Sequence, residues 1–129
     1  MGRGSSDIES VTEANQRFYE AFSSLDIQKM EEGWETSERA MCVHPGWRPL
    51  TGWETIRESW ESIFENANLM HFNVTDVKVV VEGDCAWVSC LENITSVVES
   101  RANQYFVWAT NVFVRAESEW RIVHHHASG

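Results

Sequence analysis

Apolar positions recur at two different periods along this chain, and the change of period divides it into two halves. Between residues 6 and 66 they recur every three or four positions, which is typical of amphipathic helices. Between residues 70 and 127 they alternate with polar positions or fill whole stretches, which is typical of strands. Helices in one half and strands in the other indicate an α+β fold rather than an alternating α/β fold.

The first half predicts three helices. The first covers about 7–23, and a second, short helix begins after the capping residue Asp26 and ends near Trp34. The third covers about 53–66. The side chains that the first helix should bury share one face and comprise Ile8, Val11, Ala14, Phe18, Ala21 and Phe22.

The second half predicts four long strands, at about 70–82, 84–97, 101–115 and 119–127. Only short turns join them, and short connections between long strands indicate an antiparallel meander. One further short strand, at 40–44, lies between the second and third helices and ends at Pro45. The segment from Pro45 to Thr51 is expected to be an extended loop, because it carries two prolines.

The strand at 101–115 is apolar on both faces. Alternate residues from Tyr105 to Phe113 point to one side, and the other side carries Phe106, Trp108, Val112 and Val114. The helices can cover only one of these faces, so the other needs different cover. A second copy of the chain is the simplest cover, which predicts a homodimer through the outer sheet face.

Length and charge limit the classes of partner. The 129 residues correspond to one domain, which we expect at 7–128 after a flexible tail at 1–6. With 10 Lys and Arg against 20 Asp and Glu, the net charge is -10. Such an acidic surface repels phosphate backbones and anionic lipids, so we expect no nucleic-acid and no membrane partner. No long apolar span or signal core is visible, so we expect a cytoplasmic protein.

Cysteine and tryptophan add two expectations. Cys42, Cys85 and Cys90 lie in apolar stretches without C-x-x-C spacing, so we interpret them as buried, reduced thiols. Seven Trp residues exceed what a core of this size needs. We therefore expect some of them to line a cavity or an interface.

The segment from Cys42 to Trp53 carries the first candidate for chemistry. It reads C-V-H-P-G-W-R-P-L-T-G-W, so a strand ends in His44 and two tryptophans follow before a helix. An imidazole at a strand end beside aromatic side chains is a candidate general base. The alternative is a histidine that only hydrogen bonds a loop carbonyl. Trp47 and Trp53 are candidate walls of a ligand pocket.

The last two strands carry two further candidates. Alternation places His125 on one face and its neighbours His124 and His126 on the other. Neighbours on one strand do not converge on an ion, so we expect no metal site. Asn111 is a polar position in an apolar strand, and its amide either pairs with a neighbouring side chain or water or donates to a ligand. No phosphate-binding loop or glycine-rich nucleotide motif is present in the sequence, and we expect no cofactor.

These features together resemble the NTF2-like superfamily and, within it, the SnoaL-like, ketosteroid-isomerase-like small domains. The likeness covers residues 7–128 and rests mainly on V-H-P-G-W-R-P-L-T-G, from Val43, and W-R-I-V-H-H-H-A-S, from Trp120. The fold that it implies is a cone, in which three N-terminal helices pack in a curved antiparallel sheet and a pocket opens at the wide end. In such proteins the convex sheet face often forms a dimer, in agreement with the two-faced strand.

The resemblance also implies roles for single residues. Ketosteroid isomerases use an Asp base just before a Pro, and His44 holds that position here. Their oxyanion-binding Tyr on the first helix corresponds to Phe18, which cannot donate, and their hydrogen-bonding Asp on the penultimate strand corresponds to Asn111, which can. In SnoaL-like cyclases a single acid–base group acts in an apolar pocket. His44 or His125 fits that role, and the register of the last strand favours His125 pointing inward.

We therefore expect a pocket that binds a small, mostly apolar, carbonyl-bearing molecule, with proton transfer of the isomerase or cyclase type. The candidate catalytic residues are His44, Asn111 and His125. The candidate ligand-binding residues are Trp47, Trp53, Tyr105 and Phe18. The alternative is a non-catalytic dimerisation or association module, like the association domain of calcium/calmodulin-dependent kinase, or an adaptor like the nuclear transport factor of this fold. Convergence of the polar candidates on an open cavity favours the first interpretation, and a pocket filled by Trp side chains favours the second.

Overall fold

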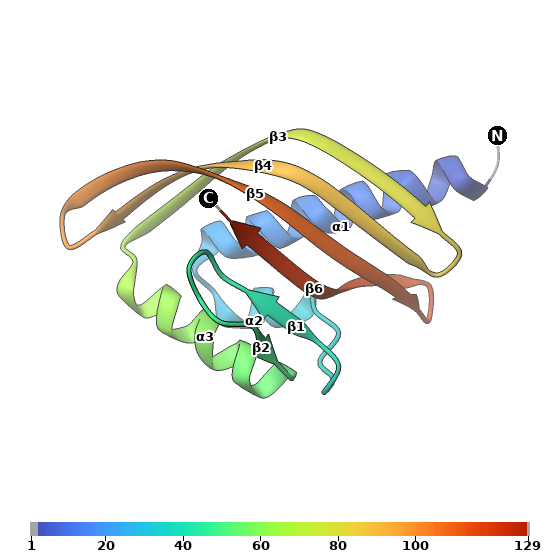
Figure 1. Ribbon diagram of the computed structural model, residues 1–129, viewed down its shortest axis with the longest axis horizontal. Coiled ribbons are helices and arrows are strands. Elements are labelled where there is room, and N and C mark those ends of the chain that lie inside the picture. Colours follow the sequence, from blue (N-terminus) through green and yellow to red (C-terminus); the bar gives the residue numbers. More distant parts are fainter. Residues whose placement is uncertain (1–2, 129) are drawn as a thin grey trace.

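The computed structural model describes residues 3–128 and has the expected α+β architecture. Helices α1 (Arg3–Ser24), α2 (Ile27–Glu32) and α3 (Trp53–Asn66) pack against a single sheet of six strands (Figure 1). The second and third helices end within two residues of the predicted limits. Helix α1 begins at Arg3, so residues 3–6 of the expected tail are helical, and residues 1 and 2 lie outside the described residues.

The strands are β1 (Met41–Val43), β2 (Leu50–Thr51), β3 (Leu69–Glu82), β4 (Cys85–Val98), β5 (Arg101–Ala116) and β6 (Glu119–Ser128). Their order in the sheet is β2-β1-β6-β5-β4-β3, and β3 to β6 form the predicted antiparallel meander. The expectation of a wholly antiparallel sheet is corrected by β1, which pairs with β6 in parallel. Because α3 and the strands β3 to β5 lie between β1 and β6 in the chain, no hairpin turn fixes their relative direction. The segment expected to be a loop also contains the short strand β2.

Tight turns set the register of the meander. The β4–β5 turn holds Glu99 and Ser100 at φ values of 52° and 67°, and the β5–β6 turn has the same pattern. Two successive positive φ values are typical of the type I′ turn, whose twist matches the flanking strands. The resulting register places Asn111 opposite His125. These two polar side chains are therefore neighbours on the same face of the sheet.

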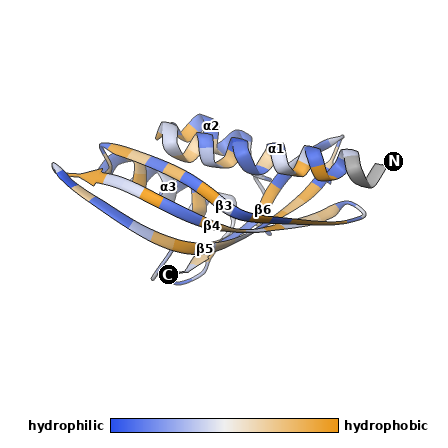
Figure 2. Cartoon of the chain, turned by 90° about the horizontal axis from the view of Figure 1, so that it is seen from above, coloured by the Kyte–Doolittle hydropathy of each residue, from blue (hydrophilic) through white to orange (hydrophobic). Residues whose placement is uncertain are grey.

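The helices cover that same face, which holds the core. Figure 2 shows α1 and α2 on one side of the curved sheet. The predicted apolar face of α1 is buried except for Ile8, which is 44% exposed because it lies near the start of the helix, beyond most of the core. Asn15 and Tyr19 of the same helix are buried as well, although the apolar pattern did not include them. No described helix combines the length and the apolar character needed to cross a membrane.

The opposite face of the sheet lacks cover from the described helices. Phe106 is 67% exposed and Trp108 is 56% exposed, and Trp87 and Val80 are exposed further along the same face, where they pair with each other on β4 and β3. On β4 and β5 the residues of this face, at alternate positions over 85–97 and 102–114, include no acid. An acidic chain thus presents an uncharged surface with exposed aromatic side chains on the outer face of β4 and β5.

Candidate functional site

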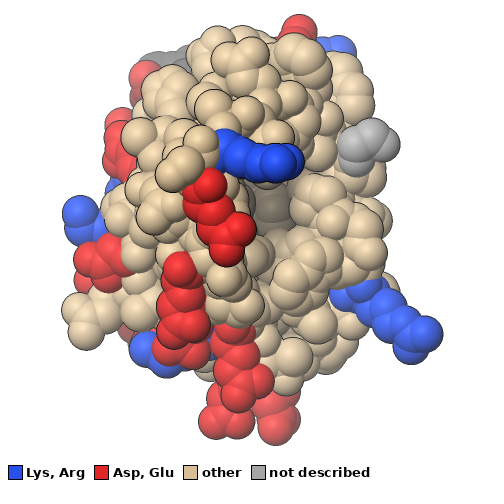
Figure 3. All heavy atoms as spheres, turned by 90° about the vertical axis from the view of Figure 1, so that its left-hand side faces the viewer, with Lys and Arg blue, Asp and Glu red and all other residues tan. Residues whose placement is uncertain are grey.

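A cavity of about 280 Å³ lies where α1, α3 and the ends of five strands meet. Figure 3 views the end of the molecule where β3 begins and β6 ends, and it shows a hollow between mostly uncharged side chains. The wall of the cavity is mainly apolar with a few polar residues, as is usual for small-molecule sites. It comprises Phe22, His44, Pro45, Trp47, Ile63, Met70, Glu92, Ile94, Tyr105, His125 and Ala127.

The structure brings four of the predicted site residues together in this wall: His44, His125, Trp47 and Tyr105. Asn111 is fully buried behind His125 and does not line the cavity. The other two predicted wall residues are core residues instead. Phe18 packs on the His125 ring with a centroid distance of 5.0 Å. Trp53 packs on Trp34 at 5.7 Å, because the start of α3 turns its ring toward the helices.

A β-bulge directs His125 inward. Trp120 and Ile122 are buried, so strict alternation along β6 would bury His124 next. The register instead shifts by one residue, since Phe113 pairs with Ile122 and the preceding β5 residue, Val112, pairs with His124. The prediction that His125 faces inward is therefore confirmed, with His125 only 1% exposed.

A chain of hydrogen bonds runs behind the cavity wall. Nδ1 of His125 lies 2.5 Å from Oδ1 of Asn111. Nδ2 of Asn111 donates to Oδ1 of Asn15 at 2.9 Å and to Oη of Tyr19 at 3.1 Å. Tyr19 in turn donates to Oε2 of Glu92 at 2.5 Å. Of the alternatives for Asn111, the structure therefore shows the one in which the amide pairs with neighbouring side chains.

The ionised form of Glu92 fixes the direction of this chain. A carboxylate only accepts, so Tyr19 donates to it and accepts from Asn111 Nδ2. Oδ1 of Asn111 then faces His125, and because an amide oxygen also only accepts, Nδ1 of His125 carries the proton. Nε2 of His125 is left with a lone pair. It has no hydrogen-bond partner among the described residues, and the only enclosed side-chain polar atom there without a partner is Nε1 of Trp60, so Nε2 is open to the cavity.

Glu92 is a candidate site residue that the sequence analysis does not contain. It is 1% exposed and lines the cavity, and no described basic side chain forms an ion pair with it. Burial raises the pKa of its carboxyl to about 7, although the hydrogen bond from Tyr19 opposes the shift. A signal was present in the sequence, since Glu92 continues the alternate row of Ala86, Val88 and Cys90 that faces inward on β4.

Tyr19 lies one position after Phe18, the residue of α1 that the resemblance aligns with the oxyanion-binding Tyr. Successive residues of a helix point about 100° apart, so the two rings reach different neighbours. Tyr19 contacts Cys90 and Glu92, whereas Phe18 packs on His125. Burial and the negative charge of Glu92 raise the pKa of Tyr19, which keeps its hydroxyl protonated as a donor.

His44 is held rigidly at the rim of the core. Oγ of Ser59 donates to the carbonyl oxygen of Ile56 at 2.6 Å, so Nε2 of His44, at 2.9 Å from the same Oγ, must donate to it. The ring packs edge-on against Trp47 and Trp60. Burial lowers the pKa of His44 to about 4, so the imidazole is neutral near pH 7. His44 therefore hydrogen bonds the hydroxyl of Ser59 on α3, and not a loop carbonyl as in the alternative interpretation of this histidine.

The buried carboxyl predicts an unusual pH dependence of stability. Between about pH 4.5 and 7 the carboxyl of Glu92 is protonated in the folded chain and ionised in the unfolded chain. The contribution of Glu92 to the free energy of unfolding therefore falls as pH rises through this range, by about 3 kcal/mol in total. His44 and His125 act oppositely, because their lowered pKa values make the folded chain lose protons first. We expect Glu92→Gln to gain stability relative to wild type between pH 4.5 and 8, measured by urea unfolding. An equal stability difference at both pH values would contradict this expectation.

The described residues contain no group of three or more His, Cys, Asp or Glu side chains placed to hold a metal ion. The three cysteines are free; Cys42 and Cys90 are buried and Cys85 is half-buried. Burial raises the pKa values of Cys42 and Cys90, so neither forms a thiolate readily. The polar chemistry of the cavity therefore lies with Glu92 and the imidazoles.

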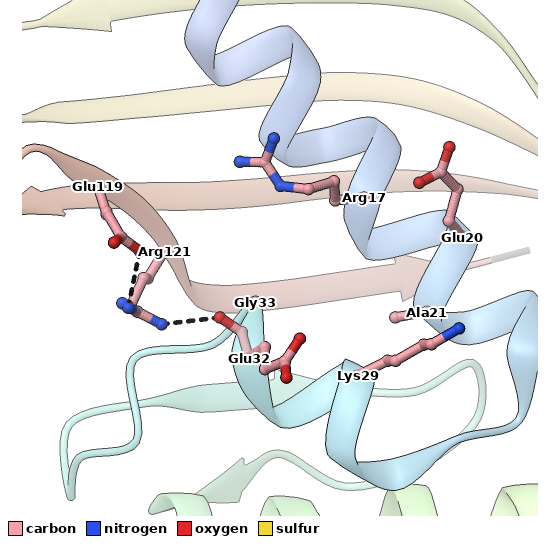
Figure 4. A pocket seen from close by; sticks show the side chains of 8 residues that line it. All are labelled: Arg17, Glu20, Ala21, Lys29, Glu32, Gly33, Glu119 and Arg121. Carbon is pink, nitrogen blue, oxygen red and sulfur yellow. Dashed lines mark hydrogen bonds and ion pairs between the residues drawn. The ribbon is translucent and has the colours of Figure 1, made fainter.

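A second hollow, of about 540 Å³, lies between α1, α2 and the start of β6 (Figure 4). Its charged residues are balanced: Arg17, Lys29 and Arg121 against Glu20, Glu32 and Glu119. Arg121 is already occupied, since it donates to the carboxylate of Glu119 at 2.8 Å and to the backbone carbonyl of Glu32 at 2.7 Å. This hollow offers no net charge to select a ligand, and none of the predicted site residues lies in it.

Comparison with known proteins gives matches over nearly the whole chain. A family model described as a SnoaL-like domain matches residues 11–129. A solved structure from Streptomyces avermitilis, an NTF2-like family protein provisionally named a dehydratase, is 37% identical with a TM-score of 0.92, covering 98% of this chain and 97% of that one. A structure from Thiobacillus denitrificans, provisionally named a calcium/calmodulin-dependent protein kinase type II association domain, is 30% identical with a TM-score of 0.79, covering 89% of this chain and 90% of that one.

One curated relative is a longer protein, of which this chain matches only a part. The F-box protein SKIP8 of Arabidopsis thaliana is 25% identical over 118 residues, which are 92% of this chain and 48% of that protein. The chain thus spans about half the length of this relative.

Proposed function

We infer that this chain, which belongs to the SnoaL-like domain family and has the NTF2-like fold, binds a small, mostly apolar, carbonyl-bearing molecule and transfers a proton on it. The observation that carries this proposal is the buried carboxyl of Glu92 in the same cavity as His125. A general base works best when its pKa lies near the working pH, and the pKa of Glu92, about 7, meets that condition.

The proposed step is the removal of a proton from the carbon next to the carbonyl group. Oε2 of Glu92 is held by Tyr19, and Oε1, which has no partner among the described residues, takes the proton. The C–H bond breaks, an O–H bond forms on the carboxyl, and the electron pair moves to the carbonyl oxygen. In a ketone with a carbon–carbon double bond next to the carbon that loses the proton, return of the proton to the far end of that double bond shifts the double bond by one position and completes an isomerisation. Apolar walls keep water away, which keeps the carboxylate basic.

The other candidates take supporting roles in this proposal. Because its pKa is about 4, His44 is a weak base near pH 7, and its Nε2 proton is committed to Ser59. We assign His44 to the wall beside Trp47. Asn111 fixes the orientation of His125 and acts as a positioning residue, since it does not reach the cavity.

The Streptomyces relative supports proton-transfer chemistry. It is provisionally named a dehydratase, and the loss of water next to a carbonyl group begins with the same proton removal. The name supports the class of reaction proposed for this chain.

The second candidate function is a non-catalytic association module, and the exposed outer sheet face favours it. The Thiobacillus relative is named for an association domain, and SKIP8 for an F-box protein. We propose that the outer face, centred on Phe106 and Trp108, binds a second copy of the chain. Such a homodimer is compatible with either function, because the cavity opens on the other side of the sheet.

Ligand uptake is the test that separates the two functions. We expect aryl ketones with one ring, such as acetophenone, to quench the fluorescence of Trp47 at the cavity wall with a saturable curve. Ile63→Trp should fill the cavity and weaken binding at least about tenfold, which corresponds to about 1.4 kcal/mol. The matched control Ile8→Trp changes an exposed position of α1 and should leave binding unchanged. No response of the wild type to any such ketone would favour the association module.

A further inference from the structure

We propose that the cavity selects a ligand that carries a hydroxyl group in addition to its carbonyl group, and that Nε2 of His125 accepts the hydrogen bond from that hydroxyl. The proposal rests on the proposed function for the carbonyl group, but recognition of the hydroxyl is a property of binding and does not require turnover. It follows from which polar atoms of the cavity wall already have hydrogen-bond partners within the protein and which have none.

His125 offers an acceptor and no donor to the cavity. Its one ring proton, on Nδ1, is committed to Asn111, which is itself held by Asn15 and Tyr19. The ring cannot turn its protonated nitrogen outward without breaking this bond and leaving Oδ1 of Asn111 buried without a donor. Such a loss is costly for a buried polar group. A ligand hydroxyl donates a hydrogen bond to Nε2. An ether or carbonyl oxygen has no proton to donate, so its lone pairs would face the lone pair of Nε2 and repel it.

The other deep polar groups of the wall have the same character. Glu92, when ionised, presents only acceptor atoms. The ring proton of His44, on Nε2, is donated to Ser59. Nδ1 of His44 contacts only the thiol of Cys42, at 3.9 Å. The deep wall therefore consists of acceptors, whereas the donors, the hydroxyl of Tyr105 and the indole of Trp47, belong to residues that are 40% and 44% exposed. This arrangement directs the ligand hydroxyl to His125 and its carbonyl oxygen toward Tyr105, which lies diagonally across from Glu92 on the same face of β4 and β5, so the carbon next to the carbonyl group stays within the reach of the base.

Volume limits the size of the ligand. A cavity of about 150 Å³ holds one benzene molecule. The cavity here, about 280 Å³, has less than twice that volume, which fits one ring with short substituents, about ten to twelve non-hydrogen atoms. Phe22, Ile63, Met70 and Ile94 supply an apolar wall for such a ring. The ligand class is thus a hydroxylated carbonyl compound with a single ring, and fused four-ring molecules are too large.

The test compares ligands that differ only in the hydroxyl. Binding of the hydroxyacetophenone isomers, the corresponding methoxyacetophenones and acetophenone is measured at about pH 7.5, where most of Glu92 is ionised and the phenol groups of the ligands still carry their protons. We expect at least one hydroxy isomer to bind about tenfold more tightly than acetophenone, and each methoxy compound to bind more weakly than its hydroxy partner. Equal affinities across the set would overturn the proposal.

Two further measurements attribute the preference to His125. In wild-type protein, ¹⁵N NMR of the histidine rings should show Nδ1 protonated and Nε2 bare, with Nε2 shifting when a hydroxylated ligand binds. This experiment needs no variant. His125→Phe keeps a ring on Phe18 and removes the acceptor, so it should abolish the hydroxyl preference while acetophenone still binds. A protonated Nε2 in the free protein, or a preference that survives His125→Phe, would contradict the assignment.

The outcomes separate this inference from the proposed function. Selective binding of hydroxyl compounds without any proton exchange on them would refute the catalytic proposal and leave the specificity of His125 intact. Proton exchange on acetophenone, with no gain from a hydroxyl group, would refute the specificity alone.

Discussion

Glu92→Gln is expected to lower the rate of proton exchange next to a ketone carbonyl by about 10²–10⁴-fold, the usual contribution of a general base. Glutamine has nearly the same size, and its carbonyl oxygen can still accept from Tyr19. It has no group that takes a proton. The fold and ligand affinity should therefore persist while the chemistry is lost. Exchange is measured by NMR as acetophenone incorporates deuterium from D₂O.

The matched control for this variant is Glu82→Gln, which changes an exposed acid at the end of β3. It should keep the wild-type exchange rate. A Glu92→Gln protein that binds acetophenone and exchanges its protons as fast as wild type would show that another group is the base.

Trp108→Glu is expected to convert a homodimer into monomers. Trp108 is 56% exposed in the single chain and lies beside Phe106 and Leu91 on a face without acids on β4 and β5. In a two-fold dimer a glutamate at this position would be desolvated without a partner, which costs about 3–5 kcal/mol and weakens association by at least about 100-fold. Sedimentation velocity over a range of concentrations measures the change.

Ile8→Glu is the control for the dimer, because Ile8 is exposed to a similar extent but lies on α1. It should leave the dimer intact. A wild-type protein that sediments as a monomer at about 100 μM, well above the Kd of stable homodimers, would refute the proposed interface.

Local patterns account for the parts of the fold that the sequence predicted. The three- and four-residue spacing on α1, the Asp26 cap of α2 and the turns of the meander each act within a few residues. The parallel pairing of β1 with β6 joins segments about 80 residues apart, with no turn to fix their direction. Pairings of this kind depend on the packed structure, and short-range patterns do not contain them.

The site was predictable to the extent that it followed strand alternation. Alternation separated His125 from its neighbours, but the bulge that turns it inward is a property of the folded sheet. The same rule places Glu92 inward with Cys90, and a single acid at an inward position of an apolar strand indicates a functional role, because burying an unpaired carboxylate is costly. Trp53 was assigned to the wall because it follows His44 closely in sequence, yet α3 turns it onto Trp34.

The pH dependence of proton exchange tests the central claim most directly, because Glu92 and His44 differ in pKa. With Glu92 as the base, the exchange rate on acetophenone should rise about tenfold per pH unit at low pH and level off above about pH 7, and Glu92→Gln should remove this profile. A rate that levels off already above about pH 4 would assign the base to a buried imidazole, His44 or His125, because burial lowers the pKa values of both. That result, or a profile unchanged in Glu92→Gln, would contradict the assignment of the base to Glu92.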